Sequence, residues 1–381
     1  MPDRLIYSDR DFLTDVLRAE HTDTPGVVEE EGSSSPPPPS AFDALLTAGW
    51  TERMRGGGVF RYPLHGLQTR VLPGALRYVA QLNVRRGVER RKPQEIRSVR
   101  QPYDGDQFNF NRVLDSPGEV LFEMTKHTTL PPPPPLTTPP PGERGGGVEP
   151  RRVTVLVNVS PLEFGHCLFV PEPSRCLPQV LTPLALRTGI ESVLLSSDPD
   201  FRVGFNSLGA FASVNHLHLH GYYLHHQLLL ETVPVEPLVP EKGFYRLTRL
   251  PRGFLFYAEP SDLDAVARVL FQVTETLVNR DIAHNLFLTR GCPPDKDARH
   301  TTWRRGVRIA LWPKRSSFGA KEESAFNVAL CELAGHLPFK IEQDYECMTE
   351  NEVNNIIQKY LLPDEEFTRL EMQLVADLID L

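Results

Sequence analysis

The sequence predicts an α+β fold, in which an antiparallel sheet carries packed helices and the whole scheme occurs twice. Between residues 153 and 224, β-branched and aromatic segments follow the order strand, strand, helix, strand, strand. Residues 242–315 follow a similar scheme, with a strand, a helix and two further strands. The repetition indicates an internal duplication into two lobes, in which Asn285 matches Asn206 and the second copy has lost the histidines of the first.

Each element is predicted from its own residue pattern. Residues 153–159 are β-branched and end before Pro161, which is typical of a buried strand. Apolar residues recur at helical spacing over 262–278, which is typical of an amphipathic helix. In chain order, strands are expected at 78–83, 120–124, 153–159, 165–171, 201–206, 214–224, 254–257, 285–289 and 307–312, and helices at 41–49, 183–195, 262–278, 350–360 and 364–379.

Runs of proline and glycine mark the segments between these elements. Residues 1–40 bury too little apolar surface to fold, apart from a short helix expected around 11–18. A Pro/Gly-rich loop at 130–150 is expected between two neighbouring strands, with a domain boundary as the alternative. The chain is therefore expected to comprise a disordered tail (1–40), a first half with the histidine cluster described below (41–235), a second, degenerate half (236–345) and C-terminal helices (346–381).

The composition argues against several classes of protein. A formal net charge of −8 argues against binding nucleic acid over a broad surface. No apolar run is long enough for a signal peptide or a membrane span, so a cytoplasmic protein without a membrane partner is expected. The five cysteines lack CxxC spacing and are expected to be free thiols in a reducing compartment.

The most informative segment is residues 216–220, in which His216, His218 and His220 alternate with leucines. Side chains two positions apart on a strand share a face, so the three imidazoles are expected on one side and the leucines in a core. On a helix the three imidazoles would be split between faces. The flanking valine and tyrosines favour the strand.

Three interpretations of this histidine cluster are open from the residues themselves. The first is a histidine-rich strand without a function, and the second is a metal site completed by His166, His225 or His226. The third is a nucleophilic site, because a neutral imidazole can attack phosphorus while its other ring nitrogen donates to a backbone carbonyl. The third interpretation is favoured.

A glycine-containing stretch comes directly before the histidines. It follows Asn206 and ends at Ser213. A tight loop there can aim backbone amides and the Ser213 hydroxyl at a phosphate. The alternative is that Ser213 is only a turn residue.

Several separated blocks of the chain occur in an order that one family shares. These blocks lie at 81–83, 108–111, 158–171, 215–223 and 326–336. The histidine string is similar to the signature of the histidine-triad superfamily, and the blocks together resemble its GDP-hexose phosphorylases. The resemblance covers roughly residues 45–350 and implies a histidine-triad-like sheet, with the half at 41–235 as the catalytic one.

The resemblance implies a reaction in two steps. His218 attacks the α-phosphorus of GDP-glucose and glucose 1-phosphate leaves; inorganic phosphate then attacks the guanylyl-histidine and releases GDP. It also implies that His216 and His220 assist, that Asn206 contacts the sugar, and that Ser213 contacts a phosphate. The scheme requires no metal and no cofactor.

Two other functions are left open by the third histidine of the triad. His220 occupies a position that is glutamine in related uridylyltransferases and histidine in hydrolases. The alternatives are a hydrolase of dinucleoside polyphosphates or nucleotide phosphoramidates, and a nucleotide- or zinc-binding module without turnover. The oligomeric state is not predicted.

The remaining polar residues carry weaker signals. His166 is assigned to nucleotide contact, with a packed core histidine as the alternative. Glu332 and His336 are expected on a helix, in a structural role. Residues 90–92 are expected to form a solvated basic face, with a phosphate clamp as the alternative.

Overall fold

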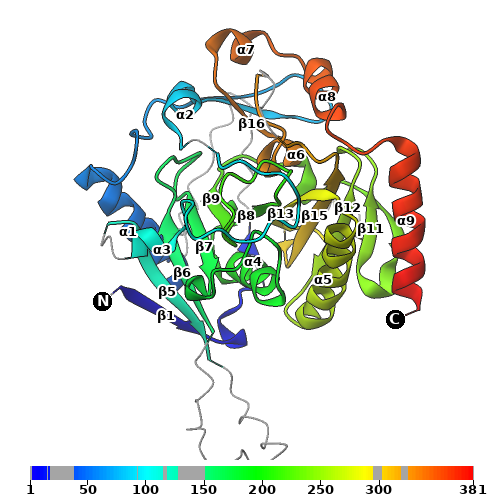
Figure 1. Ribbon diagram of the computed structural model, residues 1–381, viewed down its shortest axis with the longest axis horizontal. Coiled ribbons are helices and arrows are strands. Elements are labelled where there is room, and N and C mark those ends of the chain that lie inside the picture. The colour runs from blue at the N-terminus through cyan, green and yellow to red at the C-terminus, as the bar shows by residue number, and fades with distance from the viewer. Residues whose placement is uncertain are drawn as a thin grey trace, which may run out of the picture.

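A single eleven-stranded sheet forms the centre of the computed structural model, which describes residues 2–14, 16–17, 38–91, 93–114, 118–127, 151–294, 303–318 and 325–380 (Figure 1). In sheet order the strands are β1 (Asp3–Tyr7), β5 (Val120–Lys126), β6 (Arg152–Val157), β7 (Cys167–Pro171), β9 (Leu219–Tyr223), β8 (Phe201–Asn206), β13 (Ala283–Gly291), β15 (Gly306–Lys314), β12 (Phe254–Ala258), β11 (Phe244–Leu247) and β10 (Val235–Val239). Packed helices complete the α+β fold, as predicted.

The two halves of this sheet repeat one arrangement. Counted outward from the centre, the order is β8, β9, β7, β6, β5 in the first half and β13, β15, β12, β11, β10 in the second. The helix α4 (Pro183–Leu195) precedes β8 in the chain, and α5 (Leu263–Asn279) precedes β13. Asn206 and Asn285 are register partners where the halves meet. The repeated scheme thus forms one continuous sheet, and the domain boundaries at 235 and 345 stay predictions.

One face of the sheet is covered by α4 and α5, which lie side by side in Figure 1. The N-terminus of α4 is capped by Thr182, whose hydroxyl accepts from the amide of Ala185. The core beneath these helices includes Leu217 and Leu219, which confirms that the two leucines of the histidine string enter a core.

The opposite face carries a second core and a smaller sheet. Along β13, Leu286 and Leu288 belong to the first core and Phe287 to the second, as the alternation of a strand requires. The smaller sheet has the order β16 (His336–Phe339), β4 (Val79–Leu82), β3 (Gln68–Val71). It is flanked by α2 (Val84–Glu89), α6 (Leu330–Ala334), α7 (Glu342–Cys347) and α8 (Glu350–Gln358). These elements form the layer at the top of Figure 1.

Other elements of the chain are α1 (Ala41–Gly56), α3 (Asn111–Leu114), α9 (Asp364–Ile379) and the short pair β2 (Val16–Leu17) and β14 (Trp303–Arg304). Among them, α1 and α9 lie toward the ends of the main sheet and pack into the same core as α4 and α5. The two helices expected at the C-terminus are therefore present as α8 and α9. Among the described residues, no helix combines the length and apolarity that crossing a lipid bilayer requires.

The N-terminal segment corrects the prediction of a disordered tail over 1–40. Strand β1 pairs in parallel with β5, and the Tyr7 hydroxyl donates to Glu191 Oε2 at 2.7 Å. The helix expected around 11–18 is wrong too, since a 3-10 turn at Asp9–Asp11 precedes β2. Pairing with a strand far along the chain leaves no local signal, so the sequence did not reveal β1.

Other predictions are confirmed, corrected or lie outside the described residues. His336 lies in β16 and not in a helix, whereas Glu332 lies in α6. The loop predicted at 130–150 and residues 18–37 of the predicted tail lie outside the described residues. The strands before and after that loop, β5 and β6, are antiparallel neighbours, as expected.

Candidate active site

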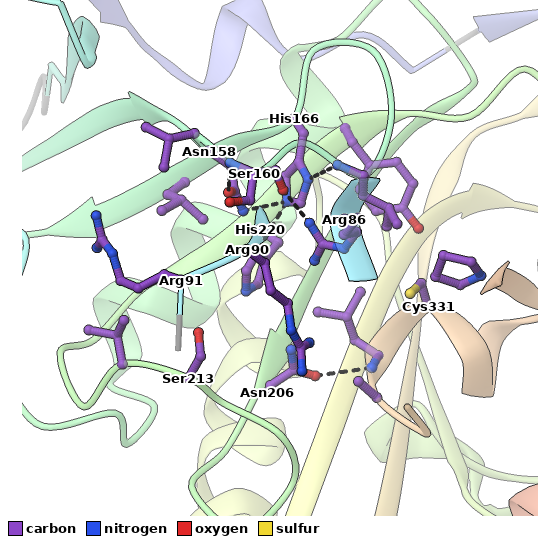
Figure 2. Close-up of a pocket in the computed structure, with 18 of the residues that line it drawn as sticks. Arg86, Arg90, Arg91, Asn158, Ser160, His166, Asn206, Ser213, His220 and Cys331 are labelled. Carbon is purple, nitrogen blue, oxygen red and sulfur yellow. Dashed lines mark hydrogen bonds between the residues drawn. The ribbon is translucent and has the colours of Figure 1, made fainter. Parts of the chain in front are cut away.

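A pocket opens between the first half of the main sheet and the layer formed by the smaller sheet (Figure 2). Five of the predicted site residues line it: Asn206, Ser213, His166, His218 and His220. The second layer adds Arg86 and Arg90 from α2 and its C-terminal end, Glu332 from α6 and Lys340 directly after β16. The pocket therefore collects polar side chains from segments that are distant in the sequence.

His218 is held in one tautomer by the backbone. Its Nδ1 lies 2.7 Å from the carbonyl oxygen of His216, so this nitrogen carries the proton and donates it. Burial lowers the pKa of His218 to about 4, which keeps the ring neutral at physiological pH. The unprotonated Nε2 is then the ring nitrogen with a lone pair available to a ligand in the pocket.

The strand predicted over 214–224 begins only at Leu219, so His216 and His218 precede it. The side-chain amide of Gln179 replaces a neighbouring strand at this point. Gln179 Oε1 accepts from the amide of His218 at 2.9 Å, and Gln179 Nε2 donates to the His218 carbonyl at 3.0 Å. Because the Gln179 side chain satisfies this backbone, the prediction of one continuous strand is wrong here.

His166 and His220 form a hydrogen-bonded pair in which His166 is the donor. The Leu162 amide donates to His166 Nδ1 at 2.8 Å, so the proton of neutral His166 is on Nε2. That nitrogen lies 3.1 Å from both His220 Nδ1 and Asn158 Nδ2, and only the imidazole nitrogen can accept its proton. Burial lowers the pKa of both histidines well below the usual value. His220 therefore carries its proton on Nε2, where it is a hydrogen-bond donor.

The side chain of His216 is not among the residues that line the pocket. Its Nδ1 accepts from the Phe110 amide at 3.1 Å, and its ring packs between Tyr103 and Phe110 at centroid distances of 5.3 and 5.6 Å. Burial lowers its pKa to about 4. The structure thus brings His218 and His220 together, with ring centroids 5.0 Å apart, and turns His216 toward Phe110.

Asn206 lies at the end of β8, where the two halves of the sheet meet. Its Oδ1 accepts from Asn285 Nδ2 at 2.6 Å and from the Leu330 amide at 3.0 Å. Figure 2 shows a dashed line that starts at Asn206. These two donors fix the Asn206 amide group, so that its Nδ2 is the donor left for a ligand.

The stretch before the histidines is a tight turn that ends at the pocket. Two of its amides, those of Ala210 and Ala212, donate to the Ser207 carbonyl within the turn. These two amides are therefore not available to a phosphate, and the expectation stays a prediction for the other amides of the loop. Ser213 lines the pocket, and its carbonyl accepts from the Gln94 amide at 3.0 Å.

Four cationic side chains line this pocket, and three of them, Arg86, Arg90 and Lys340, form one group. Burial and the charge of Arg86 lower the pKa of Arg90, and burial and the charge of Arg90 lower the pKa of Lys340. These shifts mean that the three charges lie near one another. Arg86 donates to the backbone carbonyl of Ser160, a neutral partner, and burial raises the pKa of the nearby Glu332 carboxyl. Such a group of cations is suited to an anion.

Sequence patterns missed several residues of this pocket. Lys340 is not part of a recognisable motif, and it becomes a neighbour of Arg86 only through the parallel pairing of β4 with β16. Arg90 and Arg91 line the pocket, so the expectation of a solvated face is wrong for both. Lys92 lies outside the described residues.

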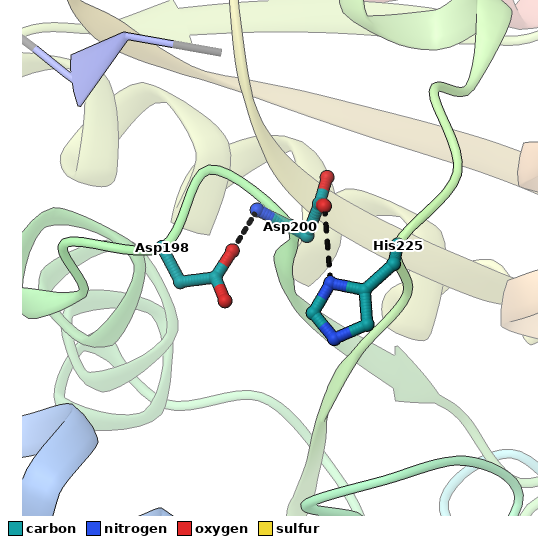
Figure 3. A group of neighbouring side chains, drawn as sticks. All are labelled: Asp198, Asp200 and His225. Atoms are coloured by element: carbon teal, nitrogen blue, oxygen red, sulfur yellow. Dashed lines mark hydrogen bonds and ion pairs between the residues drawn. The ribbon is translucent and has the colours of Figure 1, made fainter. Parts of the chain in front are cut away.

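The alternative of a metal site at the histidines included His225, and the group with suitable spacing contains His225 but none of the three alternating histidines. Within the described part of the chain, Asp198, Asp200 and His225 offer ligand atoms within 4.8 Å of one another (Figure 3). Asp200 Oδ2 lies 3.3 Å from His225 Nδ1, and Asp200 Oδ1 lies 3.3 Å from the buried guanidinium of Arg202. Asp200 shares the Arg202 guanidinium with Glu231, whose Oε1 lies at 2.8 Å, so this group forms part of an ion-pair cluster.

Comparison with solved structures places the fold in a known class. The yeast Ap4A phosphorylase Apa2 superposes with a TM-score of 0.53 at 13% identity, covering 85% of this chain and 98% of that chain. Its complex with AMP gives a TM-score of 0.54 at 14% identity, covering 84% and 96%. The chain thus has the histidine-triad-like fold, as the sequence predicted.

Two family models identify the family within that class. Residues 41–222 match the model described as "GDPGP1-like, N-terminal domain", and residues 230–380 match "GDPGP1-like, C-terminal domain". The chain therefore belongs to the GDPGP1-like family.

Relatives with names support the same conclusion. The chain is 56% identical to GDP-D-glucose phosphorylase 1 of Danio rerio over 336 residues, or 88% of this chain and 91% of the relative. It is 51% identical to the Homo sapiens protein of that name over 340 residues, or 88% and 84%. GDP-L-galactose phosphorylase 2 of Arabidopsis thaliana is 29% identical over 338 residues, or 85% and 74%. The predicted relationship to the GDP-hexose phosphorylases is confirmed.

Proposed function

We propose that this protein is a GDP-D-glucose phosphorylase, a nucleotidyltransferase that converts GDP-glucose and inorganic phosphate into GDP and glucose 1-phosphate. The observation that carries the proposal is the backbone-fixed tautomer of His218, which leaves an unprotonated Nε2 in a pocket lined by cations. The names of the animal relatives, at 51 to 56% identity, support this substrate.

The first step is nucleophilic attack by His218 Nε2 on the α-phosphorus of GDP-glucose. A nitrogen–phosphorus bond forms, the bond from phosphorus to the bridging oxygen breaks, and glucose 1-phosphate leaves with the electron pair. A sugar phosphate is a good leaving group, so no strong general acid is needed. His220 Nε2–H and the Ser213 hydroxyl are the donors that stabilise the charge on the α-phosphoryl oxygens.

In the second step, inorganic phosphate attacks the guanylyl group on His218. An oxygen–phosphorus bond forms, the nitrogen–phosphorus bond breaks, and GDP is released with the imidazole restored. Arg86, Arg90 and Lys340 bind the attacking phosphate, which enters from the side that the sugar phosphate has left. Asn206 Nδ2 is proposed to donate to the sugar.

The cationic cluster favours phosphorolysis over hydrolysis. Water needs no charged subsite, whereas a free phosphate dianion has no other anchor and must be held by positive charge. Glu332 adjoins the same three cations, and burial raises the pKa of its carboxyl. A nucleotide hydrolase is therefore the less favoured enzymatic alternative.

The product mixture distinguishes these functions. Purified protein is incubated with GDP-glucose in the presence and the absence of inorganic phosphate, and the nucleotides are separated. GDP and glucose 1-phosphate in equal amounts, formed only with phosphate, support the proposal. GMP as the product under both conditions supports the hydrolase and overturns the phosphorylase, and the absence of any product supports the binding module.

We also propose a cytoplasmic location. All five cysteines are free thiols, as predicted, and free thiols are typical of a reducing compartment. Localisation of a fluorescent fusion of the full chain, with cell fractionation, tests this proposal.

A further inference from the structure

An apolar slot lines one side of the pocket beside the proposed nucleophile. Phe110, Leu156, Leu168 and Val214 belong to one packed cluster, and all four line the pocket. The Phe110 ring lies 5.0 Å from the His218 ring. A hexose carries hydroxyl groups and a phosphate carries charge, so the part of a sugar nucleotide that suits this slot is the flat face of the base.

Two charged residues stand at this slot. Glu119 directly precedes β5, and its carbonyl accepts from the Val157 amide at 2.8 Å, which places it next to Leu156. The Arg91 guanidinium stacks on Phe108, whose ring packs against the slot cluster. In Figure 2, Arg91 points to a different part of the pocket from Arg90, which extends toward Asn206.

Glu119 and Arg91 influence each other electrostatically and remain open to a ligand. Burial raises the pKa of Glu119, and the charge of Arg91 lowers it. Burial and the charge of Arg61 lower the pKa of Arg91, and the charge of Glu119 raises it. Both side chains line the pocket, so a carboxylate acceptor and a guanidinium donor face the same slot.

We propose that Glu119 and Arg91 select guanine among the nucleobases. Guanine presents two adjacent donors, N1–H and the 2-amino group, next to the acceptors O6 and N7. A carboxylate accepts from both donors, and an arginine donates to O6 or N7. Adenine lacks the N1 donor, and uracil flanks its single N–H with two oxygens that repel a carboxylate. This inference rests on the proposed function and names the groups that read the base of its substrate.

The test compares sugar nucleotides that differ in these groups. kcat/KM is measured with GDP-glucose, with IDP-glucose, which lacks the 2-amino group, and with UDP-glucose. The wild-type protein should prefer GDP-glucose to IDP-glucose. Glu119→Gln should lower kcat/KM for GDP-glucose by roughly 10- to 100-fold, reduce the preference over IDP-glucose, and leave UDP-glucose unchanged or improved. Glu95→Gln, an exposed carboxylate outside the pocket, is the matched control.

Each other result has a defined meaning. An equal loss with all three nucleotides would assign Glu119 to the ribose hydroxyls and overturn the inference, as would unchanged selectivity. If the wild-type protein turns over none of the nucleotides, the proposed function fails before the variant is considered. Thermal unfolding of Glu119→Gln checks its fold, and if that variant does not fold, Arg91→Gln carries the same comparison: loss confined to GDP- and IDP-glucose supports the inference, and equal loss with UDP-glucose contradicts it.

Discussion

His218 Nδ1 lies 2.7 Å from the carbonyl oxygen of His216, so a backbone atom two residues earlier sets the tautomer of the proposed nucleophile. The His216 imidazole itself is turned away, toward the Phe110 amide. The contribution of His216 is therefore assigned to its carbonyl group, which any residue at that position supplies.

Replacement of the His216 imidazole should consequently be tolerated. His216→Asn retains a side-chain acceptor for the Phe110 amide and should lower kcat by less than about tenfold, which corresponds to the loss of about one hydrogen bond. Steady-state kinetics with GDP-glucose and phosphate measures this. A loss as large as that caused by His218→Ala would mean that the imidazole takes part in the reaction.

His166 is expected to act as a positioning residue through His220. Without the Nε2–H of His166, His220 can adopt the other tautomer and present a lone pair to the phosphate. His166→Phe should lower kcat by roughly 10- to 100-fold with little change in the KM for GDP-glucose. His166→Gln, which can both accept from Leu162 and donate to His220, should recover part of the activity. Equal kcat values for His166→Phe and His166→Gln would contradict the proposal that His166 sets the tautomer of His220.

The cationic cluster should determine the affinity for phosphate. GDP-glucose keeps its guanosine contacts when a cation is removed, whereas inorganic phosphate does not have other anchors. Arg90→Gln and Lys340→Gln should therefore raise the KM for phosphate by roughly 10- to 100-fold and the KM for GDP-glucose much less. Lys359→Gln, at an exposed position, serves as the control. Equal increases in both KM values would argue against a separate phosphate subsite.

Buried neutral histidines should lower the free energy of unfolding of the ligand-free protein at acidic pH. Burial lowers the pKa of a group of them: His166, His216, His218, His220, His284 and His336. Their pKa is about 6.5 in the unfolded chain, so the unfolded state binds more protons below that pH. The free energy of unfolding should thus be fully retained above pH 6.5 and fall as the pH decreases toward about 4, the pKa of folded His218.

This effect is measured as the urea concentration at the midpoint of unfolding at pH 7.5, 6.0 and 5.0. Glu163, Glu332 and Asp198 have raised pKa values and act in the opposite direction, so the histidine contribution needs its own control. His284→Phe, at a position outside the pocket lining, should make the pH dependence shallower. A midpoint that does not change between pH 7.5 and 5.0 would contradict the account.

The sequence predicted the main elements because their signals are local. Helix α4 and strand β8 have the predicted bounds, and Asn206 and Asn285, which were matched as equivalent positions of the two halves, are register partners. Strand β9 was predicted five residues too early because the pattern could not show that Gln179 takes the place of a neighbouring strand. The edge strand β1 depends on a distant partner and was likewise invisible.

The residues of the pocket could be predicted where they belong to a sequence motif, and not elsewhere. His218, His220, Asn206 and Ser213 were found from the histidine string and the residues before it, and all four line the pocket. Long-range pairing supplies the rest, since β16 brings Lys340 to α2, and this pairing has no signature in the neighbouring residues.

The guanylyl-histidine intermediate is the central claim, and intact-protein mass spectrometry tests it most directly. With GDP-glucose and no phosphate, the account predicts a mass increase of one guanylyl group, located on His218 by peptide mapping and removed when phosphate is added. His218→Ala should lack the adduct, and His225→Ala, an exposed histidine of the ion-pair cluster, should retain it. An adduct on another residue would contradict the account. Formation of product by wild-type protein on which no guanylyl group is ever detected would contradict it too.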